Sequence, residues 1–235
     1  MTVLGARRLD PERMDGEWTD LSALRRTLGR VAQVNARLGG TRALRKALLS
    51  GCRGASALQV LDVGTGDASM CVKMVEWGAA ARTPASVVGV DSHPQITEIA
   101  GTRARSHEAV RIVRADGRDL PFPDRAFDVT TCTLTLHHLD ERGAAALLSE
   151  MARVSRRMVL VNDLERCLPN LLGAKLLAAT VWRQDPVVRH DGPLSVLRSF
   201  APKELEAIGR SAGLRAVRVT RYFPYRLILS GEPPR

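Results

Sequence analysis

Hydrophobic and polar positions follow two alternating periods along this chain. Longer segments with helical spacing separate short apolar runs of strand length. Strands that alternate with helices usually pair in parallel, so this pattern predicts an α/β fold with a doubly wound, mostly parallel sheet. The expected strands are 57–63, 87–90, 110–113, 127–133 and 158–162, with helices at 68–78, from Pro94, and at 140–154.

The segment before the first strand is predicted to be helical. Apolar positions from Leu21 to Leu38 fall on one helical face, and Gly39-Gly40 supplies a stop. A second helix is expected at about 41–49. Residues 1–20 are polar and are expected to be loosely ordered, with Trp18 as a possible anchor. We expect residues 1–50 to form an N-terminal helical cap on a main domain of residues 51–235.

The end of the chain has a different pattern. A helix is expected between Phe200 and Gly213, followed by strands at 216–222 and 225–230 that Phe223-Pro224 joins. Such a short turn forces the two strands to pair antiparallel. The complete prediction is a seven-stranded, Rossmann-like sheet with a C-terminal antiparallel hairpin. The stretch 164–199 interrupts it and is apolar in its first half, so we interpret it as a lid insertion.

Composition excludes several classes of function. The net charge of +10 comes almost wholly from scattered arginines, without the aromatic-interleaved basic stripe of a single-strand binder, so nucleic-acid binding is not expected. The four cysteines are far apart, and neither a disulfide framework nor a metal site is expected. We find no signal-peptide pattern, and the longest apolar stretch is too short to span a bilayer. These features are typical of a cytoplasmic monomer or homodimer.

Candidate chemistry is concentrated where the first two strands end. The run Leu58 to Asp62 leads into Gly64-Thr-Gly66, and the next strand ends in Asp91. The glycines allow a ligand to approach bare backbone, and the aspartate would accept hydrogen bonds from both hydroxyls of a ribose. Together they predict a pocket for an adenosine-type cofactor at the carboxyl ends of parallel strands.

Five motifs, in order, resemble those of the class I S-adenosylmethionine-dependent methyltransferases, and among them the ubiquinone/menaquinone type. The matching segments cover roughly 55–230 and are Val60-Leu-Asp-Val-Gly-Thr-Gly66, Val90-Asp-Ser-His-Pro-Gln-Ile96, Ala115-Asp-Gly-Arg-Asp-Leu-Pro-Phe122, Phe127 to Leu139, and Phe200 to Leu214. One departure is Ala68, which stands where the family usually has a third glycine. Alanine is small enough to be tolerated there.

The resemblance implies S-adenosyl-L-methionine as cofactor and S-adenosyl-L-homocysteine as product. Asp62 would organise the glycine turn near the cofactor amino group, Asp91 would hold the ribose, and Asp116 would accept from the adenine amino group. Ile96 and Leu120 would flank the base. The expected cofactor-binding residues are Asp62, Gly64, Thr65, Gly66, Asp91, Ser92, His93, Ile96, Asp116, Gly117, Thr133 and His138.

Three residues are candidates for catalysis. His137 matches the position of the general base in aromatic O-methyltransferases, and an imidazole suits that role because its pKa lies near working pH. Lining of the cofactor pocket and plain packing remain alternatives for the His137-His138 pair. Asp163 would contact the substrate, act as an alternative base, or cap a helix. His190 would reach the pocket from the insertion, or lie in a surface loop.

The apolar helix 21–38 and the first half of the insertion suggest a small, hydrophobic acceptor of aromatic, polyketide or quinol type. O-methylation is the favoured reaction and C-methylation the alternative. A non-methylating cofactor-binding protein or cyclase remains possible, because fold does not fix function. An NAD-dependent dehydrogenase is disfavoured, because the third glycine of its pattern would stand at Ser69. The Asn/Asp-Pro-Pro-aromatic run of amino-methylating enzymes is absent after the fourth strand.

Overall fold

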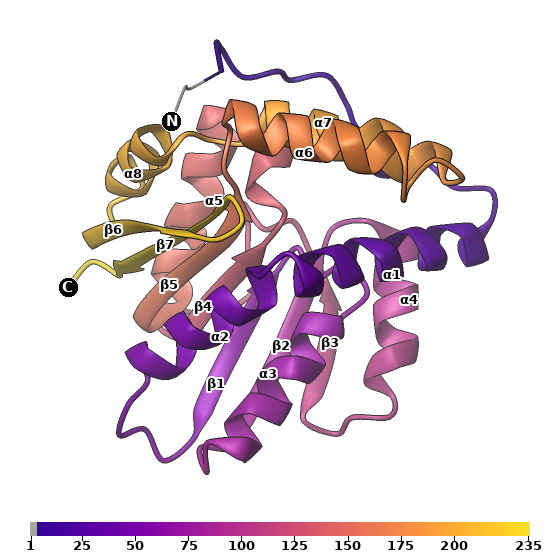
Figure 1. Ribbon diagram of the computed structural model, residues 1–235. Coiled ribbons are helices and arrows are strands. Elements are labelled where there is room, and N and C mark those ends of the chain that lie inside the picture. Colours follow the sequence, from indigo (N-terminus) through magenta and orange to yellow (C-terminus); the bar gives the residue numbers. More distant parts are fainter. Residues whose placement is uncertain (1–3) are drawn as a thin grey trace.

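A computed structural model describes residues 4–235 and contains one seven-stranded sheet (Figure 1). The strand order is β3-β2-β1-β4-β5-β7-β6. Strands β1 to β5 run parallel, and β7 pairs antiparallel with both β5 and β6. The strands are β1 (Leu58–Val63), β2 (Ala85–Asp91), β3 (Val110–Arg114), β4 (Phe127–Thr133), β5 (Ser155–Leu164), β6 (Arg215–Tyr222) and β7 (Arg226–Glu232). The predicted sheet and its antiparallel C-terminal hairpin are confirmed.

Helices cover both faces of the sheet and form a three-layer domain. One face packs against α2 (Gly40–Gly51), α3 (Ser69–Ala80) and α4 (Pro94–Ala104), and the other against α5 (Glu141–Val154) and α8 (Pro202–Ser211). Neighbouring residues of a strand point to opposite faces, so Val60 joins the core beneath α3 while Leu61 joins the core beneath α5. Both faces are apolar, as a buried parallel sheet requires.

Three further helices lie above the carboxyl ends of the parallel strands. They are α1 (Leu21–Arg37), α6 (Leu168–Ala179) and α7 (Pro186–Arg198). Helices α6 and α7 lie side by side, with α1 between them and the sheet in Figure 1. Asp20 caps α1 by accepting from the N–H of Ser22, and Asp185 caps α7. The predicted insertion is thus a pair of helices above the strand ends.

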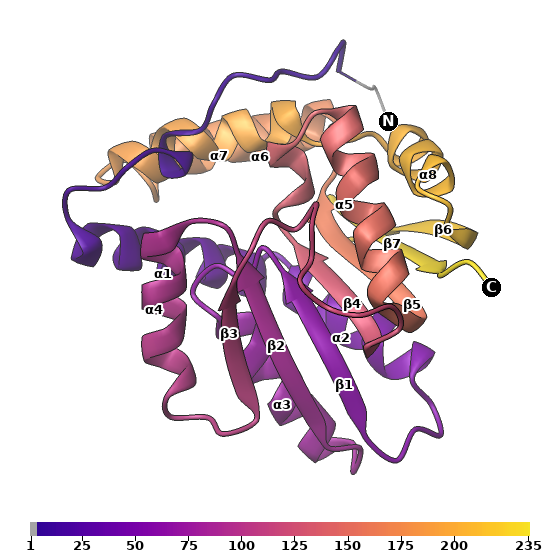
Figure 2. The ribbon, with the colours of Figure 1, turned by 180° about the vertical axis from the view of Figure 1, so that it is seen from behind.

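The N-terminal segment corrects one expectation. Residues 4–20 form a segment without regular structure apart from the 3-10 helix η1 (Arg13–Asp15), and we call it the strap. It crosses the outer side of α7 before it enters α1 (Figure 2). The Arg7 guanidinium stacks 3.5 Å from the centre of the Phe200 ring, and Glu12 is 96% buried. Trp18 packs against Leu24 and Leu28, as an anchor should. Long-range contacts, which local composition does not reveal, order this polar segment.

The other differences are small. Strand β5 is longer than predicted, and Pro193 lies inside α7. Helix α2 shares a core with the sheet through Leu44 and Leu48, while the division of the chain at residue 50 stays a prediction. Among the helices of residues 4–235, none combines the length and the apolar character needed to cross a membrane.

Candidate functional site

A cavity of about 400 Å³ opens at the carboxyl ends of β1, β2 and β4. We call it the first cavity. The twelve residues expected to bind the cofactor, from Asp62 to His138, lie on its wall, together with residues of α1 and the strap. The carboxyl ends of parallel strands meet at one edge, so motifs from different parts of the chain converge there.

The glycine turn after β1 has the backbone shape that its sequence requires. Gly64 and Gly66 have φ angles of +72° and +57°, a region that favours glycine. A Cβ on Gly64 would lie 2.2 Å from Oγ1 of Thr135, so no side chain fits there. Ala68 adopts a φ of +59° and is fully buried, so the alanine is accommodated in a left-handed conformation.

Asp62 is buried beneath this turn. Its carboxylate accepts hydrogen bonds from Oγ1 of Thr131 at 2.7 Å and from Oγ1 of Thr65 at 3.0 Å. Burial outweighs these bonds and raises the pKa of Asp62 to about 6. A positively charged group bound in the first cavity would favour the ionised form.

Asp91 closes the turn from the end of β2. Its carboxylate accepts the N–H of Gly66 at 3.2 Å and the N–H of His93 at 3.1 Å. Burial raises its pKa, although both hydrogen bonds act in the opposite direction. His93 also caps α4, with its Nδ1 accepting from the N–H of Gln95.

Most residues expected near the adenine lie on the wall of the first cavity, and their contact with the base stays a prediction. Asp116, Gly117 and Ile96 line the first cavity, and the hydrogen bond from Arg118 lowers the pKa of Asp116. Leu120 was expected to flank the base, but it is buried in the core beneath α5 and is not on the cavity wall. Its N–H donates to Glu150, which turns the loop inward at this point.

The first cavity suits a polar, charged cofactor. Its walls include three buried side-chain oxygens that have no hydrogen-bond partner within residues 4–235: Oδ1 of Asn35, Oγ1 of Thr41 and Oγ1 of Thr133. Buried polar atoms are normally paired, so these atoms indicate a missing polar ligand. Together with Asp62 they form the donors and acceptors that an amino-acid moiety needs. The residues present therefore fit S-adenosylmethionine.

A second cavity of about 310 Å³ lies between α1, α6 and α7. Its wall is mostly apolar, with contributions such as Val34, Leu177 and Trp182, and it contains one buried arginine, Arg226. The two cavities share four wall residues: Met14, Val31, Leu134 and His138. The apolar helix 21–38 and the apolar half of the insertion thus enclose a second cavity beside the first.

His137 lies on the wall of the second cavity and is paired with Asp163. Nδ1 of His137 is 2.7 Å from Oδ1 of Asp163, and the main-chain N–H of His137 donates to Oδ2 of the same carboxylate. Both residues are 98% buried. Burial acts to raise the pKa of Asp163, but the charge and hydrogen bond of His137 outweigh it and lower the pKa. Asp163 thus orients His137 rather than facing a ligand.

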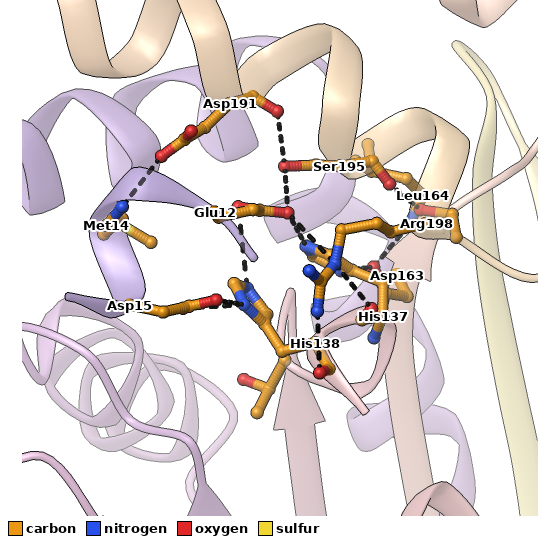
Figure 3. A network of polar contacts seen from close by, with 12 residues as sticks. Glu12, Met14, Asp15, His137, His138, Asp163, Leu164, Asp191, Ser195 and Arg198 are labelled. Atoms are coloured by element: carbon orange, nitrogen blue, oxygen red, sulfur yellow. Dashed lines mark hydrogen bonds and ion pairs between the residues drawn. The ribbon is translucent and has the colours of Figure 1, made fainter. Parts of the chain in front are cut away.

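The strap adds two carboxylates that sequence reasoning missed (Figure 3). Nδ1 of His138 lies 2.9 Å from Asp15, and Glu12 approaches both histidines. Burial acts to lower the pKa of His138, but the hydrogen bond with Asp15 and the charge of Glu12 raise it overall. The only sign of this role in the sequence is that Met14 and Trp18 interrupt a polar segment.

Two residues of α7 hold the strap in place. Arg198 donates to the main-chain oxygens of His137, His138 and Asp10, and Asp191 accepts the N–H groups of Arg13 and Met14. His190 does not reach either cavity, contrary to the expectation that it would reach the pocket. Its half-exposed ring hydrogen-bonds Asp191 and lies on neither cavity wall.

Comparison with known proteins agrees with this geometry. Residues 60–157 match the family model described as a methyltransferase domain. This segment carries the glycine turn, Asp91 and His137 within the strand order described above. This part of the chain is therefore similar to S-adenosylmethionine-dependent methyltransferases, and S-adenosylmethionine is the cofactor that the likeness implies.

Several curated relatives bear the name demethylmenaquinone methyltransferase. That of Bacillus licheniformis is 30% identical over 131 residues, which are 56% of this chain and 53% of the relative. That of Deinococcus radiodurans is 31% identical over 130 residues, which are 53% of this chain and 51% of the relative. The chain thus spans about half the length of the curated relatives it matches.

Solved structures show the same fold. A SAM-dependent methyltransferase from Aquifex aeolicus has a TM-score of 0.63 at 17% identity, covering 91% of this chain and 98% of that one. The [4+2]-cyclase SpnF has a TM-score of 0.58 at 17% identity, covering 82% and 81%. At this identity the likeness extends to the fold alone.

Proposed function

We propose that this protein methylates an oxygen of a small, hydrophobic acceptor of aromatic, polyketide or quinol type. The observation that carries the proposal is the shared wall of the two cavities. A polar chamber with the cofactor motifs adjoins an apolar chamber through Met14, Val31, Leu134 and His138. A cofactor and an apolar acceptor would meet at this wall.

In this proposal the first cavity holds the cofactor. The glycine turn and Asp62 would lie beside its amino-acid part, Asp91 would take the ribose hydroxyls, and Asp116 would take the adenine amino group. When bound, S-adenosylmethionine supplies an already activated methyl group. The protein's contribution is then mainly to position the acceptor and to exclude water.

The second cavity would hold the acceptor. Its apolar walls favour a ring or an alkyl chain, because burial of such a group is favourable by about 25 cal/mol per Å² of apolar surface. Leu176 lies on the cavity wall and is also 65% exposed, so the chamber reaches the surface beside an apolar side chain. A lipophilic acceptor would enter there.

His137 would accept the proton of the acceptor hydroxyl. Asp163 bonds to Nδ1, so it fixes the tautomer in which Nδ1 carries the hydrogen and Nε2 has the free lone pair. We propose that residues 1–50 and the insertion 164–199 act as the cap and lid of this reaction. C-methylation of a similar acceptor is the second candidate, and the names of the relatives fit a quinone-type acceptor for either reaction.

The test is binding followed by product analysis. Calorimetric titration with S-adenosylhomocysteine is expected to show one site per chain. Incubation with S-adenosylmethionine and a panel of phenols, quinols and polar alcohols is then followed by mass spectrometry for addition of CH2. An O-methylated product has one exchangeable hydroxyl hydrogen fewer than the acceptor, whereas a C-methylated product keeps that hydroxyl. Failure to bind the cofactor overturns the proposal, and a preference for polar acceptors overturns the hydrophobic class.

A further inference from the structure

Three side chains bring possible metal ligands together at the shared wall of the two cavities. Glu12, His137 and His138 each offer one ligand atom, and these atoms lie within 4.8 Å of one another. Oε1 of Glu12 is 3.6 Å from Nε2 of His137, and Oε2 is 4.0 Å from Nε2 of His138. Figure 3 shows the carboxylate between the two rings. We call these residues the Glu12–His137–His138 cluster.

The opposite nitrogen of each ring is held by a separate carboxylate. Nδ1 of His137 bonds to Asp163 at 2.7 Å, and Nδ1 of His138 lies 2.9 Å from Asp15. Histidines that bind metals almost always donate their other ring N–H to such a group, which fixes the tautomer and makes the ligand more basic. This arrangement occurs twice here, and in both cases it leaves Nε2 facing Glu12.

We propose that the Glu12–His137–His138 cluster binds a divalent cation of the Mn²⁺, Fe²⁺, Co²⁺ or Zn²⁺ class. Two imidazoles and one carboxylate suit these ions, whereas Mg²⁺ and Ca²⁺ prefer an all-oxygen environment. Three protein ligands leave at least one coordination position for another molecule. The expectation of no metal site rested on the cysteines, which are not involved.

The position of the cluster gives the cation a role. His137 and Glu12 line the second cavity, while His138 lines both cavities. An open position would face the acceptor chamber and would hold an acceptor oxygen. A bound cation lowers the pKa of a coordinated hydroxyl, so with the cation present the hydroxyl would release its proton to solvent while His137 binds the metal; His137 is the proton acceptor in the cation-free protein. Only this role rests on the proposed function, because cation binding requires neither acceptor nor cofactor.

The surroundings of Glu12 keep its carboxylate in place. Oγ of Ser195 donates to Oε1 of Glu12 at 2.9 Å, and Nε of Arg198 lies 3.7 Å from the same oxygen. The other carboxylate oxygen of Glu12, Oε2, faces His138. Without a cation, the same atoms would form an ion-pair network around a protonated imidazole. The experiment must therefore separate a cation site from such a network.

The test uses the full chain with any histidine tag removed, stripped with chelator and titrated with Co²⁺. We expect one Co²⁺ per chain and a visible absorption spectrum of low-symmetry coordination. Glu12→Gln and His138→Ala should abolish the spectrum. Asp163→Asn should weaken binding by about 10–100-fold, because it removes the partner of a ligand. His107→Ala is the matched control, since this half-buried histidine lies outside the cluster.

Two results would overturn the cation site: no Co²⁺ bound in the micromolar range, or an unchanged spectrum in Glu12→Gln. Circular dichroism of each variant shows whether it is folded, and Glu12→Gln keeps the shape of the side chain. Titration of the chelator-treated, metal-free protein with S-adenosylhomocysteine tests the cofactor pocket separately. Cofactor binding without Co²⁺ binding rejects this inference alone, whereas Co²⁺ binding without cofactor binding rejects the proposed function alone.

Discussion

His137 and Asp163 form a buried pair in which one carboxylate holds both the ring and the main chain of the histidine. Nδ1 of His137 lies 2.7 Å from Oδ1, and its N–H donates to Oδ2 at 3.2 Å. This double contact fixes where Nε2 points, toward the second cavity and Glu12. The chemistry proposed for the site depends on that direction.

His137→Ala should lower kcat by about 10²–10⁴-fold, the usual contribution of a positioned proton acceptor. Affinity for S-adenosylhomocysteine should stay the same, because His137 lies outside the first cavity. Steady-state kinetics and calorimetry measure the two effects, with His107→Ala as a control of unchanged activity. Unchanged turnover in His137→Ala would remove its catalytic role and leave the cofactor site intact.

Gly64→Ala should abolish cofactor binding and destabilise the fold. The new Cβ would lie 2.2 Å from Thr135 Oγ1, and the left-handed φ costs an alanine about 1 kcal/mol more. Gly101→Ala in α4 is the matched control. It has open space around it and should stabilise by about 0.5–1 kcal/mol. Urea unfolding and calorimetry report both effects, and normal cofactor affinity in Gly64→Ala would contradict the assigned pocket.

Cofactor affinity should fall as the pH drops through about 6. Burial raises the pKa of Asp62 to about 6, and its ionised form attracts the positive amino group of the cofactor. Titrations with S-adenosylhomocysteine at pH 8 and pH 5 should therefore differ. In Asp62→Asn, affinity should be weak at both values, because this position no longer titrates. An equally steep pH profile in the variant would assign the effect to another group.

The same substitution should stabilise the cofactor-free protein at high pH. The pKa of Asp62 is raised in the folded chain, so its ionisation opposes folding above about pH 6, and this cost disappears below its unfolded value near 3.8. A difference of about two pH units corresponds to about 3 kcal/mol. Asp62→Asn should approach that gain at pH 8 and show almost none at pH 3.5, as measured by urea unfolding. A gain that persists at pH 3.5 would contradict this account.

Arg226→Met should also stabilise the protein. Arg226 is 99% buried, and among the described residues its Nε and Nη1 find no hydrogen-bond partner. Burial lowers its pKa to about 10. Replacing a poorly paired buried charge by an apolar side chain of similar size stabilises some proteins by about 1–4 kcal/mol. Arg218→Met, at an exposed position of β6, is the control and should change the unfolding free energy little.

The order of strands and helices followed from the sequence because it depends on local patterns. Apolar runs predicted the strands of the parallel sheet, and the Phe223-Pro224 turn predicted the antiparallel hairpin. The cofactor-binding residues could also be predicted from the sequence, since Gly64 directly follows β1 and Asp91 is the last residue of β2. In a parallel sheet the strand ends share one edge, so a sequence position is enough to place these residues in one cavity.

The other half of the site was decided by contacts between distant segments. Asp15 and His138 are 123 positions apart, and only the packing of the strap against α7 brings them together. A polar segment of this kind appears disordered from its composition, because neither periodicity nor propensity encodes its long-range partners. His190 shows the converse: its neighbour Asp191 faces the site, whereas the helical direction of α7 turns His190 outward.

The sequence by itself therefore determined the sheet, the cofactor turn and its acidic partners, because each depends on residues close together in the chain. Only the tertiary structure decided that Asp163 orients His137 and that Glu12 joins the two histidines. It also decided that Leu120 belongs to the core. The physical reason is that side-chain direction and burial at these positions depend on packing between elements, and chain order does not specify that packing.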